Sequence, residues 1–175
     1  MQVEVYVQDC LSEYSQSESI KIEDIEIPIT AQTWENWFNC WLEILQPNIS
    51  SAANYEIGLR LTNDSEIQEL NAQYRQQNKP TDVLSFAALE VDSPMPSEAF
   101  ASMPLYLGDI VISIDTAQQQ AQKQGHTLVT ELAWLASHGL LHLLGWDHPD
   151  EESLERMLKQ QVKLLKSIGI SIDIE

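Results

Sequence analysis

The stretch TLVTELAWLASHGLLHLLGWDH, residues 127–148, is the most informative part of this 175-residue chain. Residues 127–144 are apolar on nearly every side of a helix, and helices with that pattern lie buried in the centre of a protein. Gly145 follows directly, and glycine at that place permits the left-handed turn that ends a helix. The stretch therefore predicts a central buried helix followed by a reversal of the chain.

Three of the four histidines of the chain lie in this stretch. His138 and His142 are four residues apart, so a helix projects both imidazoles from the same face. A reversal at Gly145 can bring His148 back towards them. Three imidazole nitrogens around one point form the cage of a catalytic zinc ion, with a fourth position left for water. We therefore predict one zinc ion per chain, bound by His138, His142 and His148.

Other interpretations of the histidines remain open. Each could be an ordinary core residue, although buried imidazoles need partners and one metal ion supplies a partner to all three. The spacing HxxxHxxGxxH is also that of zinc peptidases, which carry a glutamate as general base directly after the first histidine. That position is Gly139 here, so an ordinary peptidase is disfavoured. A structural zinc would need a closing fourth ligand, and Cys10 and Cys40 are remote in sequence, although folding could bring one near.

Two acidic residues near the histidines have ordinary explanations. Glu131 precedes His138 by seven residues, about 10 Å along a helix, which is too far for both to bind one ion directly. We interpret it as an acidic residue in the first helical turn, where the helix dipole favours it. Asp147 could orient a ligand imidazole or could be a turn residue.

Hydrophobic periodicity outlines the rest of the chain. Alternating apolar residues predict strands at 3–7, 55–61, 83–89 and 107–114. Helical spacing and capping residues predict helices at 31–46 after Thr30, at 65–76 with a Ser65–Gln68 capping box, at 115–123, and at 151–166 after Asp150. Residues 12–24 are predicted to be exposed, and 90–103 to form a loop. Strands alternating with helices, with hairpin-like short links early on, predict one α+β domain over residues 1–175, with a mixed sheet packed against helices.

The composition excludes several classes of protein. There are 27 acidic and 9 basic residues, which gives a net charge of −18. This argues against a basic surface that grips nucleic acid and against adhesion to an anionic membrane. No apolar run reaches the about 18 residues of a membrane span, and the N-terminus does not resemble a secretory signal. Two cysteines without CxxC spacing fit a reducing compartment, so we expect a cytoplasmic protein.

Four ordered blocks of sequence resemble the YbeY family, the metal-dependent endoribonucleases of bacterial ribosomal RNA maturation. They are LNAQYRQQNKPTDVLSF (70–86), LGDIVIS (107–113), the run Gly125, His126 and Glu131, and HGLLHLLGWDH (138–148). Two departures are visible. Trp146 stands where the family more often has tyrosine, which removes a hydroxyl, and Ala87 stands where proline is common, at a predicted strand end.

The resemblance implies a zincin-like α+β fold, zinc on the three histidines and a functional arginine at Arg75. An arginine fork can neutralise the negative charge that phosphoryl transfer places on nonbridging oxygens. Without the resemblance, Arg75 would be interpreted as an exposed cation at a helix end. For Thr81, Asp82, Ser85 and Asp109, capping, turn formation and strand-edge hydrogen bonding are at least as well supported as contact with RNA.

The leading hypothesis is therefore a zinc-dependent, single-strand-specific endoribonuclease that acts on ribosomal RNA precursors. The expected partners are single-stranded RNA and the ribosome or a ribosomal protein, with no membrane and no DNA. The alternatives are a non-hydrolytic ribosome-assembly factor with a structural zinc, and a zinc hydrolase of another substrate. Because the chain is so acidic, we expect weak nonspecific affinity for RNA. A basic stripe on the last helix (Arg156, Lys159, Lys163 and Lys166) is either a solvated face or an RNA contact.

Overall fold

The computed structural model describes residues 2–9, 29–46, 54–88 and 105–172. The predicted exposed segment 12–24, the predicted loop 90–103 and Cys10 lie outside the described residues. In the described part, one sheet contains β1 (Gln2–Asp9), β2 (Asn54–Thr62), β3 (Val83–Ala87) and β4 (Leu105–Ser113). The helices there are α2 (Ala31–Leu45), α3 (Asp64–Arg75), α5 (Ile114–Gln124), α6 (Leu128–Leu143) and α7 (Glu151–Ser167).

The sheet is mixed, which confirms the predicted α+β class. Its strand order is β1-β2-β4-β3, with β1 and β4 parallel to β2 and with β3 antiparallel to β4. The short links expected early in the chain do not make a hairpin there, because α2 connects β1 to β2 and parallel strands need such a crossover. Only β3 and β4 are antiparallel neighbours in the described sheet.

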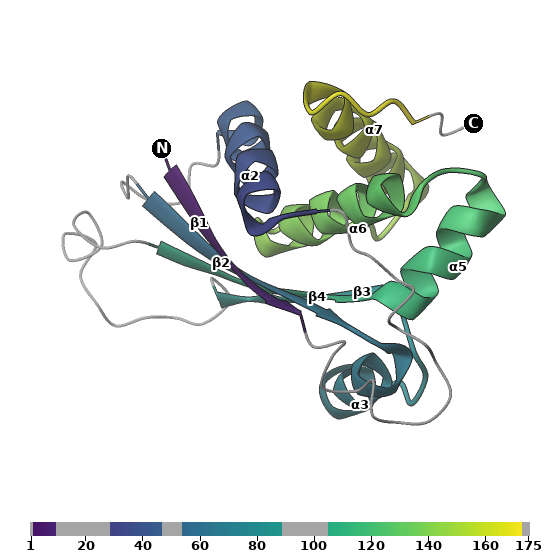
Figure 1. The fold of residues 1–175 in the computed structure, drawn as a ribbon. Coiled ribbons are helices and arrows are strands. Elements are labelled where there is room, and N and C mark those ends of the chain that lie inside the picture. Colours follow the sequence, from purple (N-terminus) through teal and green to yellow (C-terminus); the bar gives the residue numbers. More distant parts are fainter. Residues whose placement is uncertain (1, 10–28, 47–53, 89–104, 173–175) are drawn as a thin grey trace.

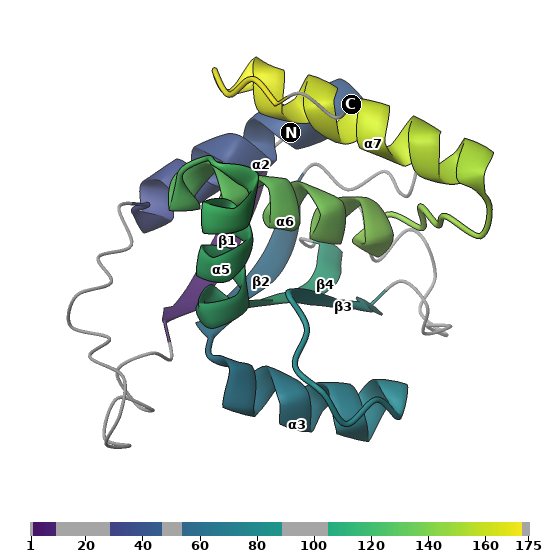
Figure 2. The same cartoon turned by 90° about the vertical axis from the view of Figure 1, so that its right-hand side faces the viewer.

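The helices divide unequally between the two faces of the sheet. Helix α3 lies on one face, whereas α2, α5, α6 and α7 lie on the other (Figures 1 and 2). Helix α6 lies directly on the sheet against β3 and β4, and α5 and α7 pack on its remaining sides. This enclosure explains why the segment is apolar nearly all round, and it confirms the predicted central helix.

A close contact places α6 against the sheet at Gly139. A Cβ atom there would lie 2.8 Å from Ile110 Cγ2 and 3.2 Å from Ser85 Oγ, so only glycine allows the approach without displacement. The hydroxyl of Ser85 on β3 donates a hydrogen bond of 3.0 Å to the Gly139 carbonyl. Gly139, which stands where zinc peptidases have glutamate, therefore serves the close packing of α6 against the sheet.

The outer edge of β1 is covered by side chains of α2. The backbone N–H of Val3 donates to Asn39 Oδ1 at 2.9 Å, and that of Val5 donates to Glu35 Oε1 at 3.4 Å. On its other side, α2 is tied to α7, because the indole of Trp41 donates to the Leu164 carbonyl at 3.0 Å. Helix α2 thus links one sheet edge to the outermost helix.

The start of α3 differs from the prediction. The N-cap is Asn63, whose side-chain oxygen accepts a hydrogen bond of 3.0 Å from the backbone N–H of Glu66. Ser65, predicted as the cap, lies within the first turn. Both residue types cap helices well, and the extended backbone at Asn63 (φ −112°) decides between them. The other caps named above, Thr30 and Asp150, are confirmed.

No helix in the described part of the chain is long and apolar enough to cross a membrane. The cytoplasmic location itself stays a prediction.

Gly108 generates a prediction about stability. It has a φ of +135° beside a register shift between β2 and β4, and a Cβ atom there would lie 2.2 Å from the Phe86 carbonyl oxygen. We expect Gly108→Ala to lower the free energy of unfolding by more than about 3 kcal/mol, because it adds backbone strain to a steric clash. The measurement is urea unfolding followed by circular dichroism.

Gly125→Ala is the matched control for this variant. Gly125 also has a positive φ, +74°, but a Cβ atom there meets nothing within 4 Å. The Gly125→Ala variant should lose only about 1 kcal/mol of unfolding free energy, which is the penalty for placing alanine in the left-handed conformation. Equal losses in the two variants would contradict the proposed clash.

Candidate metal centre

The three histidines predicted as ligands lie together. His138 and His142 project from one face of α6, and His148 follows the turn after the helix. Their potential ligand atoms all lie within 4.8 Å of one another. Gly145 has the predicted left-handed conformation (φ +93°), and the Trp146 N–H closes the helix by donating to the Leu141 carbonyl at 2.9 Å. This turn returns the chain towards the helix face that carries the other two histidines.

The spacing of the two nitrogens contributed by α6 fits a tetrahedral metal ion. Nε2 of His138 and Nε2 of His142 are 3.0 Å apart. Two nitrogens bound to one tetrahedral zinc are separated by about 3.3 Å, given zinc–nitrogen bonds of about 2.0–2.1 Å. A metal ion between these two atoms therefore needs only a small adjustment of the rings.

A buried glutamine orients the first histidine. Nδ1 of His138 lies 3.2 Å from Oε1 of Gln161 on α7, and Gln161 Nε2 donates to the Trp134 carbonyl at 3.2 Å. Because this second bond points the amide oxygen of Gln161 towards the ring, Nδ1 of His138 carries the proton. Nε2 then presents a lone pair to the neighbouring histidines, which is the form that binds a metal ion.

The protonation equilibria of the two helical histidines agree with that form. Burial lowers the pKa of His138 below its ordinary value, against the opposing effect of the hydrogen bond with Gln161. Burial also lowers the pKa of His142, and the neighbouring His138 and His148 lower it further. Neutral imidazoles are the state required of metal ligands.

Sequence reasoning missed Gln161. The signal was present, because Gln161 falls on the apolar stripe of α7 that also contains Met157, Leu164 and Leu165. It is fully buried, and a polar residue in such a stripe needs a specific partner.

Arg75 lines a cleft together with His138 and His142. It is the last residue of α3, and its Nη2 donates to the Ser85 carbonyl on β3 at 2.7 Å. Its guanidinium carbon also lies 5.9 Å from the centre of the Phe86 ring. A cleft of about 560 Å³ is lined by Arg75, Asp82, Val83, Leu84, Ser85, Ala87, His138, His142, Gly145, Trp146 and Asp147. The structure thus brings Arg75 to one cleft with His138 and His142, although more than 60 residues separate Arg75 from these histidines in sequence.

The other residues named in the sequence analysis lie at different places: some line the cleft, some order a turn, and one lies on the opposite face of the sheet. Asp82 caps its own turn, because Oδ1 accepts from the Val83 N–H at 2.7 Å, and it also lines the cleft. Asp147 accepts from the backbone N–H of His148 at 2.8 Å, so it orders the turn. Asp109 lies on the other face of the sheet, beside Tyr106. Trp146 lines the cleft with an apolar ring, and Ala87 ends β3.

Glu131 lies in the first turn of α6, as predicted, and is not part of the histidine group. Its Oε2 pairs with Nε2 of His126 at 2.5 Å. Burial raises the pKa of this carboxyl group, and His126 acts in the opposite direction. Cys40 is also outside the group, with its sulfur 3.4 Å from the hydroxyl of Ser167. Among the described residues, no cysteine therefore completes a closed structural zinc site.

A prediction follows from the contact between Gln161 and His138. Gln161→Leu removes the acceptor that holds the His138 ring, so zinc affinity should fall about 10- to 100-fold. Competition with a chromophoric chelator measures this affinity. Gln160→Leu, one residue away on α7 and not fully buried, is the control and should retain wild-type affinity. Equal affinities in all three proteins would show that Gln161 only fills space.

The chain is similar to known proteins along most of its length. The family model described as Endoribonuclease YbeY matches residues 19–169. A protein of Trichormus variabilis named Endoribonuclease YbeY is 62% identical over 99% of this chain and 98% of its own length. A Nostoc protein of the same name is 61% identical over 99% of this chain and 94% of its own length.

A solved structure has the same fold. The solution structure of TM1509 from Thermotoga maritima matches with a TM-score of 0.53 and 24% identity, covering 94% of this chain and 88% of that one. The identity is too low for this match to show more than the fold. The family model and the full-length relatives decide the relationship: the chain belongs to the YbeY family of endoribonucleases.

Proposed function

We propose that the cleft between α6 and β3 is the active site of a zinc-dependent endoribonuclease that cuts single-stranded RNA. His138, His142 and His148 hold the zinc ion, and Arg75 contacts the phosphate at the cleavage point. The observation that carries the proposal is that Arg75 lines one cleft together with His138 and His142, two of the three clustered histidines. A metal-ligating group facing an arginine fits a phosphodiester, which needs charge neutralisation on its nonbridging oxygens.

The chain holds Arg75 ready for this contact. An arginine side chain has five N–H donors, and Ser85 accepts from one of them. The Phe86 ring beside the guanidinium and the short hydrogen bond to β3 limit its movement, so little ordering is needed when a phosphate arrives. A bound zinc ion would supply Lewis-acid chemistry, by withdrawing charge from a phosphoryl oxygen and by making water more acidic.

Hydrolysis of peptides is disfavoured by the same site. Gly139 provides no general base, and a glutamate there would clash with Ile110 and Ser85. Its carboxylate would also be forced against the buried side of α6, where an unpaired charge is costly.

The proposed substrates are ribosomal RNA precursors, as the family resemblance implies, and the proposed partner is the ribosome or a ribosomal protein. With a net charge of −18, the protein should be repelled by RNA except at local cations such as Arg75. Delivery of the RNA by the ribosome would overcome this repulsion. The basic stripe on α7 is exposed, and Lys159 within it pairs with Glu155 at 3.0 Å.

Arg75→Ala tests the phosphate role. The variant should bind zinc with wild-type stoichiometry, yet cleave a single-stranded RNA about 10²- to 10³-fold more slowly, because a transition-state contact is lost. The measurements are metal analysis of the purified protein and gel-resolved cleavage of an end-labelled RNA. Lys79→Ala, which removes a nearby exposed cation, is the control and should cleave normally. Wild-type cleavage by Arg75→Ala would contradict the assignment.

Metal removal tests the site itself. We expect chelation to abolish cleavage by the wild-type protein and zinc to restore it, because the ion provides the Lewis acid. His142→Ala should neither retain zinc nor regain activity on its addition. Cleavage that persists in this variant would refute the proposed metal centre.

A further inference from the structure

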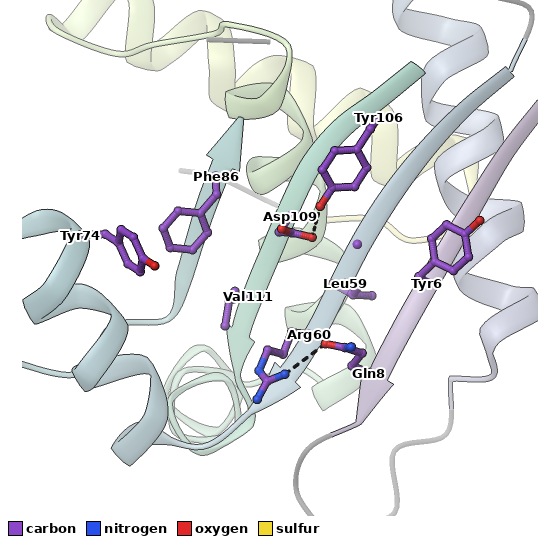
Figure 3. A pocket seen from close by; sticks show the side chains of 10 residues that line it. Tyr6, Gln8, Leu59, Arg60, Tyr74, Phe86, Tyr106, Asp109 and Val111 are labelled. Carbon is purple, nitrogen blue, oxygen red and sulfur yellow. Dashed lines mark hydrogen bonds between the residues drawn. The ribbon is translucent and has the colours of Figure 1, made fainter. Parts of the chain in front are cut away.

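The face of the sheet opposite α6 contains a second hollow. Helix α3 covers only the β3 side of this face, where Ile67, Leu84 and Val111 pack together. The uncovered part forms a hollow of about 520 Å³, within the range of small-ligand sites (Figure 3). Gly58 lines this hollow, and any side chain there would clash, because a Cβ atom would lie only 2.0 Å from Oδ1 of Asp109 on the neighbouring strand.

Aromatic side chains surround this hollow. The exposed large hydrophobic residues in the described part are Tyr6, Tyr74, Tyr106 and Leu154, and all three tyrosines line the hollow. Tyr74 and Tyr6 are each 53% exposed, and the Tyr74 ring meets the Phe86 ring edge-on at a centroid distance of 5.2 Å. Exposed aromatic rings gathered at one place mark a binding site, and flat rings are suited to stacking on a planar ligand.

The polar groups of the hollow favour a neutral ligand with N–H donors. Asp109 is exposed and accepts a hydrogen bond from the Tyr106 hydroxyl. Glu4 and Glu56 lie near Tyr6, and hydrogen bonds to these carboxylates raise the pKa of Tyr6 to about 12. Arg60 is bound by both oxygens of Glu66, at 2.5 and 2.7 Å. Asp109 is therefore the carboxylate that lines the hollow, with Glu4 and Glu56 close by, and it can accept hydrogen bonds from a nucleobase.

The hollow adjoins the metal cleft. Phe86 lines the hollow, and the guanidinium of Arg75, which lines the cleft, lies beside its ring. One RNA strand can therefore place a phosphate at Arg75 and turn a neighbouring base over the edge of β3 onto the tyrosines.

We propose that this hollow binds an unpaired guanine of the RNA strand, with its ring against the aromatic pair Tyr74 and Phe86 and its N1–H and N2–H groups on the carboxylate of Asp109, which is the strand partner of Phe86 (Figure 3). Guanine is the only standard base with two adjacent donors on its Watson–Crick edge, and a carboxylate accepts both. The proposal rests on the proposed function, because the strand is positioned by its phosphate at Arg75. It makes the hollow a determinant of sequence preference beside the cleavage point.

Equilibrium binding to the zinc-loaded protein tests the proposal. The probes are two fluorescein-labelled, 2′-O-methylated nine-nucleotide strands, one all-uridine and one with a single central guanine, measured by anisotropy. The wild-type protein should bind the guanine strand at least tenfold more tightly. Asp109→Asn should reduce this preference to less than threefold. Tyr74→Ala should weaken binding of the guanine strand about tenfold, whereas Tyr74→Phe, which keeps the ring, should not.

Leu154→Ala is the control, since it removes an exposed apolar side chain outside the hollow, and it should bind both strands normally. Equal affinity of the wild-type protein for the two strands, or unchanged guanine preference in Asp109→Asn, would overturn the proposal. The proposal would also be overturned if a labelled oligolysine peptide bound the wild-type protein more tightly than the guanine strand does and lost this binding in Tyr74→Ala. The hollow would then recognise a basic protein. None of these readouts requires cleavage, so the base site and the proposed catalysis can fail separately.

Discussion

The functional arrangement depends on how closely α6 approaches the sheet at Gly139. Without a side chain there, the helix backbone lies against Ile110 and accepts a hydrogen bond from Ser85. His138 and His142 lie on the same side of Gly139 in the helical wheel, and both line the cleft together with residues of β3. Ser85 also accepts from Arg75 through its carbonyl, so one residue of β3 joins both walls of the cleft. The proposed metal ligands and the arginine are thus both positioned against the same short strand, β3.

The net charge of the molecule also limits how it can contact RNA. A net charge of −18 disfavours RNA binding through the general surface, so we expect selectivity to come from a few local contacts. The cleft provides an arginine and a metal-binding group, whereas the hollow on the other face provides rings and carboxylates. Phosphate and base would thus be recognised by chemically different surfaces that meet at Phe86.

Local sequence predicted the histidine group, because helix geometry and the glycine turn involve only residues 138–148. Arg75 could be predicted only through the family resemblance, since it reaches the cleft from another helix and the order of strands brings it there. The pairing of strands far apart in the chain depends on more than any short stretch of sequence, so the parallel pairing of β1 with β2 could not be predicted. Gln161 was missed because its partner lies on a different helix, and the cap of α3 was misplaced because Asn63 and Ser65 are both good capping residues.

The two hydrogen bonds from β1 to α2 have a consequence for how this sheet behaves towards other chains. A bare edge strand is a template on which a second strand can add, and that addition leads to aggregation. Asn39 and Glu35 occupy the outward N–H groups of Val3 and Val5, so this edge has fewer donors to offer an incoming strand. At the opposite edge, Arg75 occupies the Ser85 carbonyl. Side chains from the protein's own helices thus partly close both borders of the sheet, and this reduces the number of backbone groups on which an unfolded neighbour could add a strand.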